Sequence, residues 1–342
     1  MNYLSESTRL LYSQLLSQCL HVAAPNGRGL SFVTKIIKGS KHWYLQLTIG
    51  SHKTQHYVGP DSDDVNTLIS NEKKLWDKAK PDRSEREKLV AMLISGEAHT
   101  VSTAEARLFE VLERTGVFLM GGVLVGSHAF SLYGNMLGVN WPTNMTQTHD
   151  IDIAGDNHIA LGVRNDKVEL KQSLMDAQMG FIEVPSLNRK APSTKFRIQG
   201  KQLSVDILTP LTGKPSSTPI LLKSLNTYAE PLRFLDYLLE ETQPAVIIAR
   251  AGILVNVPSP ARYALNKLVT SVRRQPAFQT MALKDIIQSE QLLYVLLEDR
   301  PGDIQAAFIA AKKMPEKFLI QLEQGIKKLP EKLSKSLEKY IS

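Results

Sequence analysis

The sequence predicts an α+β protein with a β-rich N-terminal region, an α/β core and a helical C-terminal domain. Three observations support this fold class. Short β-rich runs fill residues 29–59, an apolar strand broken by Gly126-Ser127 precedes a strand with two aspartates, and a helical period runs from Pro258 onward. The expected divisions are residues 1–100, 101–257 and 258–342.

The composition is that of a globular protein. The chain has 342 residues, of which 43% are hydrophobic and 22% charged, enough for two or three ordinary domains. The net charge of +7 is compatible with a polyanionic partner but does not identify one. Cys19 is the only cysteine, which excludes an internal disulfide and a multi-cysteine zinc site. We find no signal-peptide pattern and no membrane-spanning apolar run, so we expect a cytoplasmic protein without membrane contact.

The first hundred residues read as a helix, a small sheet and charged linker helices. Apolar positions within residues 3–20 follow a helical period, and β-rich runs beginning at Phe32, Trp43 and Thr54 predict a three-stranded meander. A helix over residues 64–97 should break at Pro81. Basic and aromatic residues are interleaved along the meander: Lys35, Lys38, Lys41, His42, Lys53 and His56 with Trp43, Tyr44 and Tyr57. They favour either a nucleic-acid face or, more commonly, a packed aromatic face with solvated lysines.

The core begins with a capped helix and a strand that ends in a Gly-Ser turn. Ser102-Thr-Ala-Glu is a capping box that starts a helix through Glu113. Val123–Val125 then breaks at Gly126-Ser127, which opens the next helix and offers N–H groups and a hydroxyl to a phosphate. Asp150 and Asp152 alternate along a strand, so both carboxylates point the same way and favour a divalent metal between them.

The second half of the core supplies a third acid. We expect a helix from Asp166 to Met179 and strands near 181–184, 195–198 and 203–208, the last carrying Asp206. If that strand neighbours the first aspartate strand, three carboxylates meet. A hairpin is expected over residues 245–257. Helix boundaries beyond it are expected at four prolines: Pro276, Pro301, Pro315 and Pro330.

Enzymes that transfer nucleotidyl groups combine N–H groups that bind phosphate with carboxylates that bind metal. In this interpretation Asp150 and Asp152 hold one Mg²⁺ on a nucleoside triphosphate and share a second with Asp206. Asp206 is best placed to receive the proton of an acceptor hydroxyl, while Gly126 and Ser127 hold phosphates. Mn²⁺ is the alternative metal. A lone Asp-x-Asp is a weak signal, but the order of these strands, turn and helix is much more specific.

The same residues carry a family resemblance. Gly126-Ser127, Asp150-Ile-Asp152 and Asp206 resemble the nucleotidyltransferase fold of the DNA polymerase β type, over roughly residues 103–210. The resemblance implies a mixed sheet with flanking helices, Mg²⁺ and an NTP. Three further segments resemble one poorly characterised bacterial family with a β-rich N-terminal and a helical C-terminal region: Tyr57–Ser62, Val125–Phe130 and Pro260–Lys267. The interval from Ser127 to Asp150 is longer than in compact members, which predicts an insertion around residues 138–148.

Basic residues outside the core are further candidates for phosphate contacts. Two C-terminal helices, beginning at Pro260 and near Met281, carry Arg262, Lys267, Arg273, Arg274 and Lys284. Lys267 and Lys284 resemble the triphosphate-binding residues that a helical domain supplies in similar enzymes, including abortive-infection toxins. The alternative is ordinary helix surface charge. Lys195 and Arg197 share one strand face, and Arg197 is taken as a nucleotide-binding candidate. His128 and His149 are interpreted as non-catalytic.

Three functions follow as hypotheses. The first is an enzyme that moves a nucleoside monophosphate from an NTP, ATP included, to a hydroxyl and releases pyrophosphate. RNA or tRNA, a protein side chain and a small molecule such as an aminoglycoside remain open as acceptors, and a toxin-like modifier of tRNA fits. The second is a nucleotide sensor, which the presence of all three acids disfavours. The third is a nucleic-acid-binding module built on the meander. The NTP, the oligomeric state and a regulatory partner protein remain open.

Overall fold

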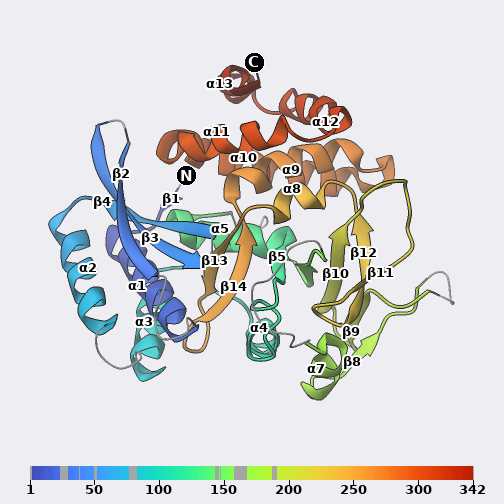
Figure 1. Cartoon of the computed structure of the whole chain (residues 1–342), viewed down its shortest axis with the longest axis horizontal. Coiled ribbons are helices and arrows are strands. Elements are labelled where there is room, and N and C mark those ends of the chain that lie inside the picture. Colours follow the sequence, from blue (N-terminus) through green and yellow to red (C-terminus); the bar gives the residue numbers. More distant parts are fainter. Residues whose placement is uncertain are drawn as a thin grey trace.

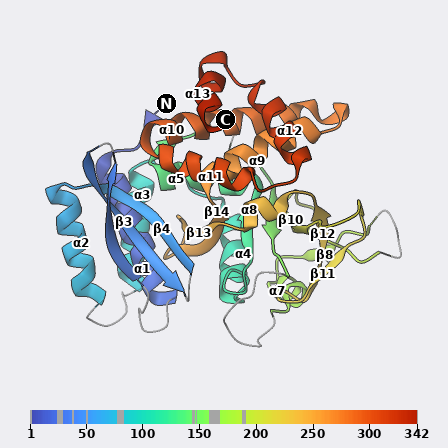
Figure 2. The same ribbon diagram turned by 45° about the horizontal axis from the view of Figure 1, so that its top comes forward.

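The computed structural model describes residues 2–23, 30–37, 39–49, 52–76, 83–142, 146, 148–157, 168–186 and 191–341. The chain is an α+β protein, as predicted (Figure 1). A small sheet with its helices lies at one end, a larger sheet lies at the other, and the C-terminal helices lie across the top of both. Figure 2 shows the same helices covering the central strands from the front.

The N-terminal region confirms the predicted meander. Helix α1 (Glu6–Ala23) is followed by β2 (Leu30–Ile37), β3 (Ser40–Ile49) and β4 (His52–Pro60), which pair antiparallel in that order. The long predicted helix is two helices, α2 (Asp63–Trp76) and α3 (Arg83–Ser95). The segment around Pro81 lies outside the described residues.

The large sheet is mixed, as the family resemblance implied. Its strand order is β11 (Ile220–Leu222), β12 (Thr227–Leu232), β10 (Ser204–Pro210), β7 (Asp150–Ala154) and β5 (Val123–Val125). β10 runs parallel to β7 and β12, and β5 runs antiparallel to β7. The first half of β10 pairs with β9 (Lys195–Ile198), which in turn pairs with β8 (Phe181–Glu183). The second half pairs with β12, so the sheet forks beside β10.

Two helices connect these strands to the rest of the core. α4 (Thr103–Arg114) begins with the predicted capping box at Ser102, and α5 (Gly126–Leu137) is buried along almost its whole length. α7 (Leu170–Asp176) is shorter than the helix predicted over 166–179, whose first two residues lie outside the described part of the chain. In the predicted insertion, β6 (Val139–Asn140) pairs with β1 (Asn2–Tyr3). Residues 143–145 and 147 of that insertion are among those not described.

The predicted hairpin is β13 (Thr242–Ile247) and β14 (Ile253–Pro258), preceded by the short α8 (Leu235–Leu239). The chain is helical from there on: α9 (Pro260–Arg273), η2 (Pro276–Phe278), α10 (Gln279–Asp299), α11 (Pro301–Ala311), α12 (Glu316–Ile326) and α13 (Glu331–Ile341). The four prolines lie at helix boundaries, as expected. No helix in the described ranges is long and apolar enough to cross a membrane. One continuous apolar core joins all three regions, so the three-part division stays a prediction.

Candidate active site

Two neighbouring strands bring the three predicted acids onto one face of the large sheet. The register of β7 and β10 places Asp152 beside Asp206 and Asp150 beside Ser204. Paired residues of adjacent strands direct their side chains to the same face. The structure therefore brings Asp150, Asp152 and Asp206 together, while their catalytic roles stay predictions.

A lysine from the next strand lies between two of these acids. Lys195 is opposite Asp206 in the register of β9 and β10. Its Nζ lies 3.0 Å from Asp206 Oδ2 and 3.3 Å from Asp150 Oδ1. Ser204 Oγ donates a hydrogen bond of 2.5 Å to the same oxygen of Asp150. Lys195 and Ser204 thus fix the orientation of the acids from within the sheet.

Burial and mutual repulsion set the ionisation of the acids. Burial raises the pKa of Asp152 to about 6, and the charge of Asp206 adds to this effect while Lys267 opposes it. Burial also raises the pKa of Asp206, against the hydrogen bond from Lys195. Burial opposes ionisation of Asp150 as well, but Ser204 and Lys195 outweigh it and lower the pKa of that carboxyl. The face therefore concentrates more negative charge than its neighbours neutralise.

This donor set fits a hard divalent cation. Carboxylate oxygens are the ligands that Mg²⁺ prefers, and Asp206 Oδ1 is buried with no hydrogen-bond partner among the described residues. Within the same residues, no three His, Cys, Asp or Glu side chains are grouped closely enough to hold a metal ion. The expected Mg²⁺ site is therefore not confirmed and stays a prediction.

The turn into α5 places backbone N–H groups beside the acids. Gly126 has a φ of 66°, in the left-handed region that favours glycine, and a methyl group there would collide with the Asp152 carboxylate. Val125 precedes the helix, and its apolar side chain cannot cap the first N–H groups. These N–H groups and the half-buried Ser127 lie where the sequence predicted a phosphate cradle.

Gly126→Ala is expected to impair the site more than the fold. The substitution costs about 1–2 kcal/mol of backbone strain and displaces Asp152. We expect Mg²⁺-NTP binding to weaken about tenfold or more, since one carboxylate moves by the size of a methyl group. Nucleotide titration and urea unfolding would measure the two effects separately.

Gly200→Ala is the matched control for this change. Gly200 has a φ of 73°, and apart from its chain neighbours no described residue has an atom within 4 Å of the position of an added methyl group. The control should lose similar stability and keep its nucleotide affinity. Equal affinity in the two variants would contradict a role of the Gly126 turn in binding.

Behind the acids, a buried histidine supports the start of β7. His128 Nδ1 lies 3.2 Å from the Asp150 carbonyl oxygen, and its Nε2 lies 3.0 Å from Glu105 Oε1. Burial opposes ionisation of Glu105, but hydrogen bonds from His128 and Ser102 outweigh it and lower the pKa of Glu105 to about 2. The capping box of α4 thus also orients His128. His149 is exposed at the strand end.

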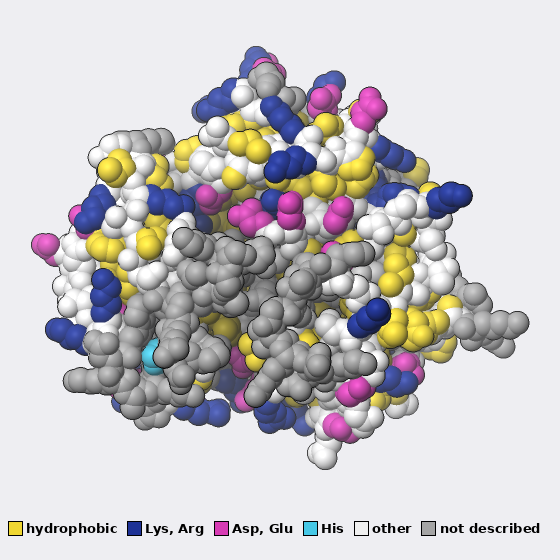
Figure 3. Space-filling model, viewed as in Figure 1, with side chains coloured by type: hydrophobic (Ala, Val, Ile, Leu, Met, Phe, Trp, Pro, Cys, Tyr) yellow, Lys and Arg dark blue, Asp and Glu magenta, His cyan; other side chains and the backbone are white. Residues whose placement is uncertain are grey.

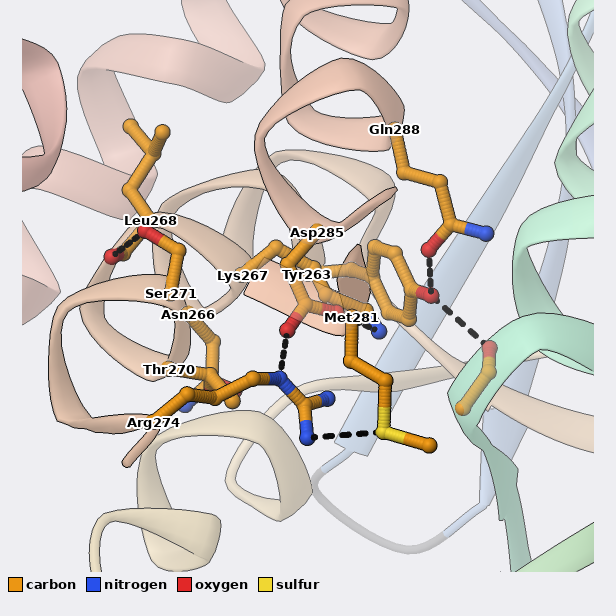
Figure 4. Close-up of polar contacts among 11 residues, drawn as sticks. Tyr263, Asn266, Lys267, Leu268, Thr270, Ser271, Arg274, Met281, Asp285 and Gln288 are labelled. Carbon is orange, nitrogen blue, oxygen red and sulfur yellow. Dashed lines mark hydrogen bonds and ion pairs between the residues drawn. The ribbon is translucent and has the colours of Figure 1, made fainter. Parts of the chain in front are cut away.

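Helices α9 and α10 close over the Gly126 turn with a polar network (Figure 4). The Tyr263 hydroxyl lies 2.8 Å from the Gly126 carbonyl oxygen and 3.2 Å from Gln288 Oε1. Lys267 Nζ lies over the Tyr263 ring, 5.3 Å from its centroid. The charge of Lys267 opposes the rise in the pKa of Asp152 that burial causes, which indicates that Lys267 is close to the acids.

Asp285 is the anionic centre of this network. Its carboxylate is 3% exposed and pairs with Lys267 Nζ at 2.7 Å and Arg274 Nε at 2.5 Å. Lys284 is adjacent in sequence, and burial together with the charge of Lys267 lowers its pKa. Lys267 and Lys284, the two predicted triphosphate contacts, therefore lie close enough to each other to interact.

The other predicted cations lie in different surroundings. Arg197 is exposed on β9, opposite Ser204, so Lys195 rather than Arg197 reaches the acids. Arg262 is buried and pairs with Glu240 at 2.6 Å and Glu241 at 3.0 Å, which is a structural arrangement. Arg273 donates to the Arg233 carbonyl and lies over the Phe234 ring.

In the N-terminal sheet the aromatic residues already have partners. Trp43 donates to Asp61 at 2.8 Å, and Tyr57 lies under Arg300 from the α10–α11 junction. Lys35 covers the ring of Tyr44, which is buried. Figure 3 shows lysine and arginine side chains scattered around the outline of one face, without one continuous basic patch among its described residues. The contacts of Trp43, Tyr44 and Tyr57 favour the interpretation of the meander as a packed aromatic face with solvated lysines. The side chains of Lys38, Lys53 and His56 lie outside the described part.

Sequence reasoning did not select three residues that the structure places at the site. Ser204 precedes Asp206 by two positions in a strand, a spacing that would have placed both on one face. Tyr263 and Asp285 gave no such signal, because their contacts depend on how α9 and α10 pack against β5 and α5.

Comparison with known proteins gives one match. A family model described as nucleotidyltransferase matches residues 103–312, which span α4 to α11. No curated protein and no solved structure matches the chain. The matched range contains the acids, the Gly126 turn and the network around Asp285.

Proposed function

Because the chain belongs to this nucleotidyltransferase family, we propose that it transfers a nucleoside monophosphate from an NTP to a hydroxyl acceptor at the face bearing Asp150, Asp152 and Asp206. The single observation that supports this site best is the register that pairs Asp152 with Asp206, beside the N–H groups of the Gly126 turn. This arrangement brings carboxylates that suit a metal next to N–H donors that suit a phosphate.

Asp150, Asp152 and Asp206 would hold the Mg²⁺, two ions in our proposal, with Mn²⁺ as a substitute. Bound there, the metal would neutralise triphosphate charge and increase the acidity of the acceptor hydroxyl. Asp206 has a free buried oxygen, Oδ1, that suits it to receive the acceptor proton. The acceptor oxygen forms a bond to the α-phosphorus, the bond to the β-phosphate oxygen breaks, and pyrophosphate leaves.

The remaining residues would orient and stabilise the triphosphate. The first N–H groups of α5 and the Ser127 hydroxyl would donate to phosphate oxygens. Lys267, held by Asp285, would supply positive charge from the side opposite the sheet, with Lys284 next to it. Arg197 is the weakest candidate, since its exposed position does not direct it toward the acids.

Label transfer tests the proposal. Purified protein with Mg²⁺, each α-³²P-labelled NTP in turn, and total RNA plus protein extract should label one class of macromolecule. The matched control carries Glu230→Gln, an exposed acid on β12 of the same sheet. It should retain transfer, whereas Asp150→Asn should lose it.

The distribution of label identifies both the base and the acceptor. Label in RNA or in protein would each support nucleotidyl transfer and name the acceptor class. Equal labelling by the wild type and Asp150→Asn would count against the site. Acid-dependent NTP binding without transfer to RNA, protein or added small hydroxyl compounds would indicate a nucleotide sensor instead.

A further inference from the structure

Lys195 contacts the acids of the candidate site directly. Its ammonium contacts two of the three acids from a neighbouring strand, and its side chain is 37% exposed. Lys267 is held mainly by Asp285, and Arg197 forms no ion pair with the acids among the described residues. Lys195 is therefore a counter-charge on the same carboxylates that the proposed function assigns to metal.

The surroundings of Lys195 allow it to leave that position. A lysine has a flexible four-carbon side chain with three rotatable donors, so its ammonium can change partners without moving the strand. The backbone of Lys195 is fixed by β9 and by the Ser193 hydroxyl, which accepts from its N–H at 3.3 Å. Partial exposure provides the space on the solvent side of the acids.

A divalent cation and Lys195 cannot use the same oxygens together without repulsion. Lys195 Nζ is in direct contact with Asp150 Oδ1 and Asp206 Oδ2, two carboxylates that the proposed function assigns to the metal. A metal bound to these acids would displace the ammonium, which then needs a new anion. The closest new anion in the reaction is the triphosphate that accompanies the metal.

We propose that Lys195 is an exchangeable counter-ion, which neutralises Asp150 and Asp206 until metal-NTP binds and then transfers its contact to the phosphates. This inference rests on the proposed function and adds a phosphate-binding residue to it. It predicts effects of opposite sign for one substitution. Lys195→Gln should strengthen binding of the metal alone and weaken binding of the metal-bound nucleotide.

Mn²⁺ binding, followed by electron paramagnetic resonance, tests the first half. Lys195→Gln should bind Mn²⁺ about three- to tenfold more tightly than the wild type, since a competing charge is removed. Lys195→Arg should stay close to the wild type because it keeps the charge. Lys201→Gln is the matched control, with the same substitution in the exposed turn that follows β9, and should leave the affinity unchanged.

Equilibrium binding of a non-hydrolysable NTP with Mg²⁺ tests the second half. Lys195→Gln should bind it about three- to tenfold more weakly than Lys201→Gln does. Unchanged Mn²⁺ affinity in Lys195→Gln, or unchanged nucleotide affinity, would overturn the exchange. Circular dichroism checks that every variant is folded.

A failure of the proposed function would give a different result from a failure of the exchange. If the wild type binds Mn²⁺ no better than Asp152→Asn, the acids hold no metal and both proposals are wrong. If binding depends on Asp152 but Lys195→Gln behaves like Lys201→Gln, only the exchange is wrong.

Discussion

Asp152→Asn is expected to abolish nucleotidyl transfer and, at neutral pH without metal, to stabilise the fold. Loss of a carboxylate that we propose to hold the metal should remove several kcal/mol of transition-state stabilisation, a fall in rate of about a thousandfold or more. Stability should change in the other direction, because the buried Asp152 charge is repelled by Asp206. Opposite changes in activity and stability distinguish a functional acid from a structural one.

The effect of Asp152→Asn on stability should depend on pH, and the direction of this dependence can be tested. The pKa of Asp152 is about 6 in the folded protein, above the ordinary value of 3.8 that applies to the unfolded chain. Between these values the folded chain binds more protons than the unfolded chain, so wild-type stability falls as pH rises. We expect Asp152→Asn to be about 1–3 kcal/mol more stable than the wild type at pH 7.5, and this difference to disappear near pH 4.

Urea unfolding in EDTA at pH 4, 6 and 7.5 measures this difference. Glu230→Gln, the exposed acid on β12, should shift stability by less than about 0.5 kcal/mol at each pH. A destabilised Asp152→Asn variant at pH 7.5 would mean that Asp152 is a structural residue in the folded protein.

Asp285→Ala should be among the most destabilising single changes in the C-terminal helices. The substitution removes the partner of Lys267, whose side chain is 13% exposed, and of the more accessible Arg274. An uncompensated buried charge costs about 3–5 kcal/mol. We also expect weaker nucleotide binding, because Lys267 loses the carboxylate that orients it.

Two comparisons make the Asp285 experiment specific. Glu331→Ala removes an exposed partner of Lys335 at 2.6 Å and should cost about 0.5 kcal/mol or less. Asp285→Leu combined with Lys267→Met replaces the buried pair by apolar groups and should recover most of the lost stability. Urea unfolding that finds Asp285→Ala and Glu331→Ala equally stable would refute the buried-charge argument.

The sequence predicted the strands and the turn of the site better than the packing of α9 and α10 over it. Asp150, Asp152 and Asp206 follow from strand alternation, and the register of β7 and β10 then brings them together. The sequence could not predict which cation lies between these acids, because Lys195 and Arg197 share one strand face. Only the register of β9 against β10 determines that Lys195, and not Arg197, lies opposite Asp206. Asp285 is a surface residue by its sequence context and becomes buried only because α9 packs on α10.

The same distinction holds for the fold. The meander, the C-terminal helices and the hairpin were predicted from periodicity and proline positions. β11 and β12 were not, since Pro231 lies inside the alternating run of β12 and prolines argue against a strand. Pairing of Pro231 with Thr209 at the fork of the sheet makes that position acceptable. Whether a proline is acceptable in a strand thus depends on tertiary contacts, which local sequence patterns do not reveal.

The contact between α1 and the β13–β14 hairpin has a consequence for synthesis of the chain. The Val246 N–H donates to the buried Tyr12 hydroxyl at 3.0 Å, across 234 positions of sequence. At about 5–20 residues per second, a ribosome needs roughly 12–47 s to add the hairpin after α1. During that time Leu15 and Leu16, both fully buried in the finished fold, cannot contact the hairpin. The packing of α1 on the hairpin is therefore completed late, long after α1 has met the earlier elements α2, α3 and β4.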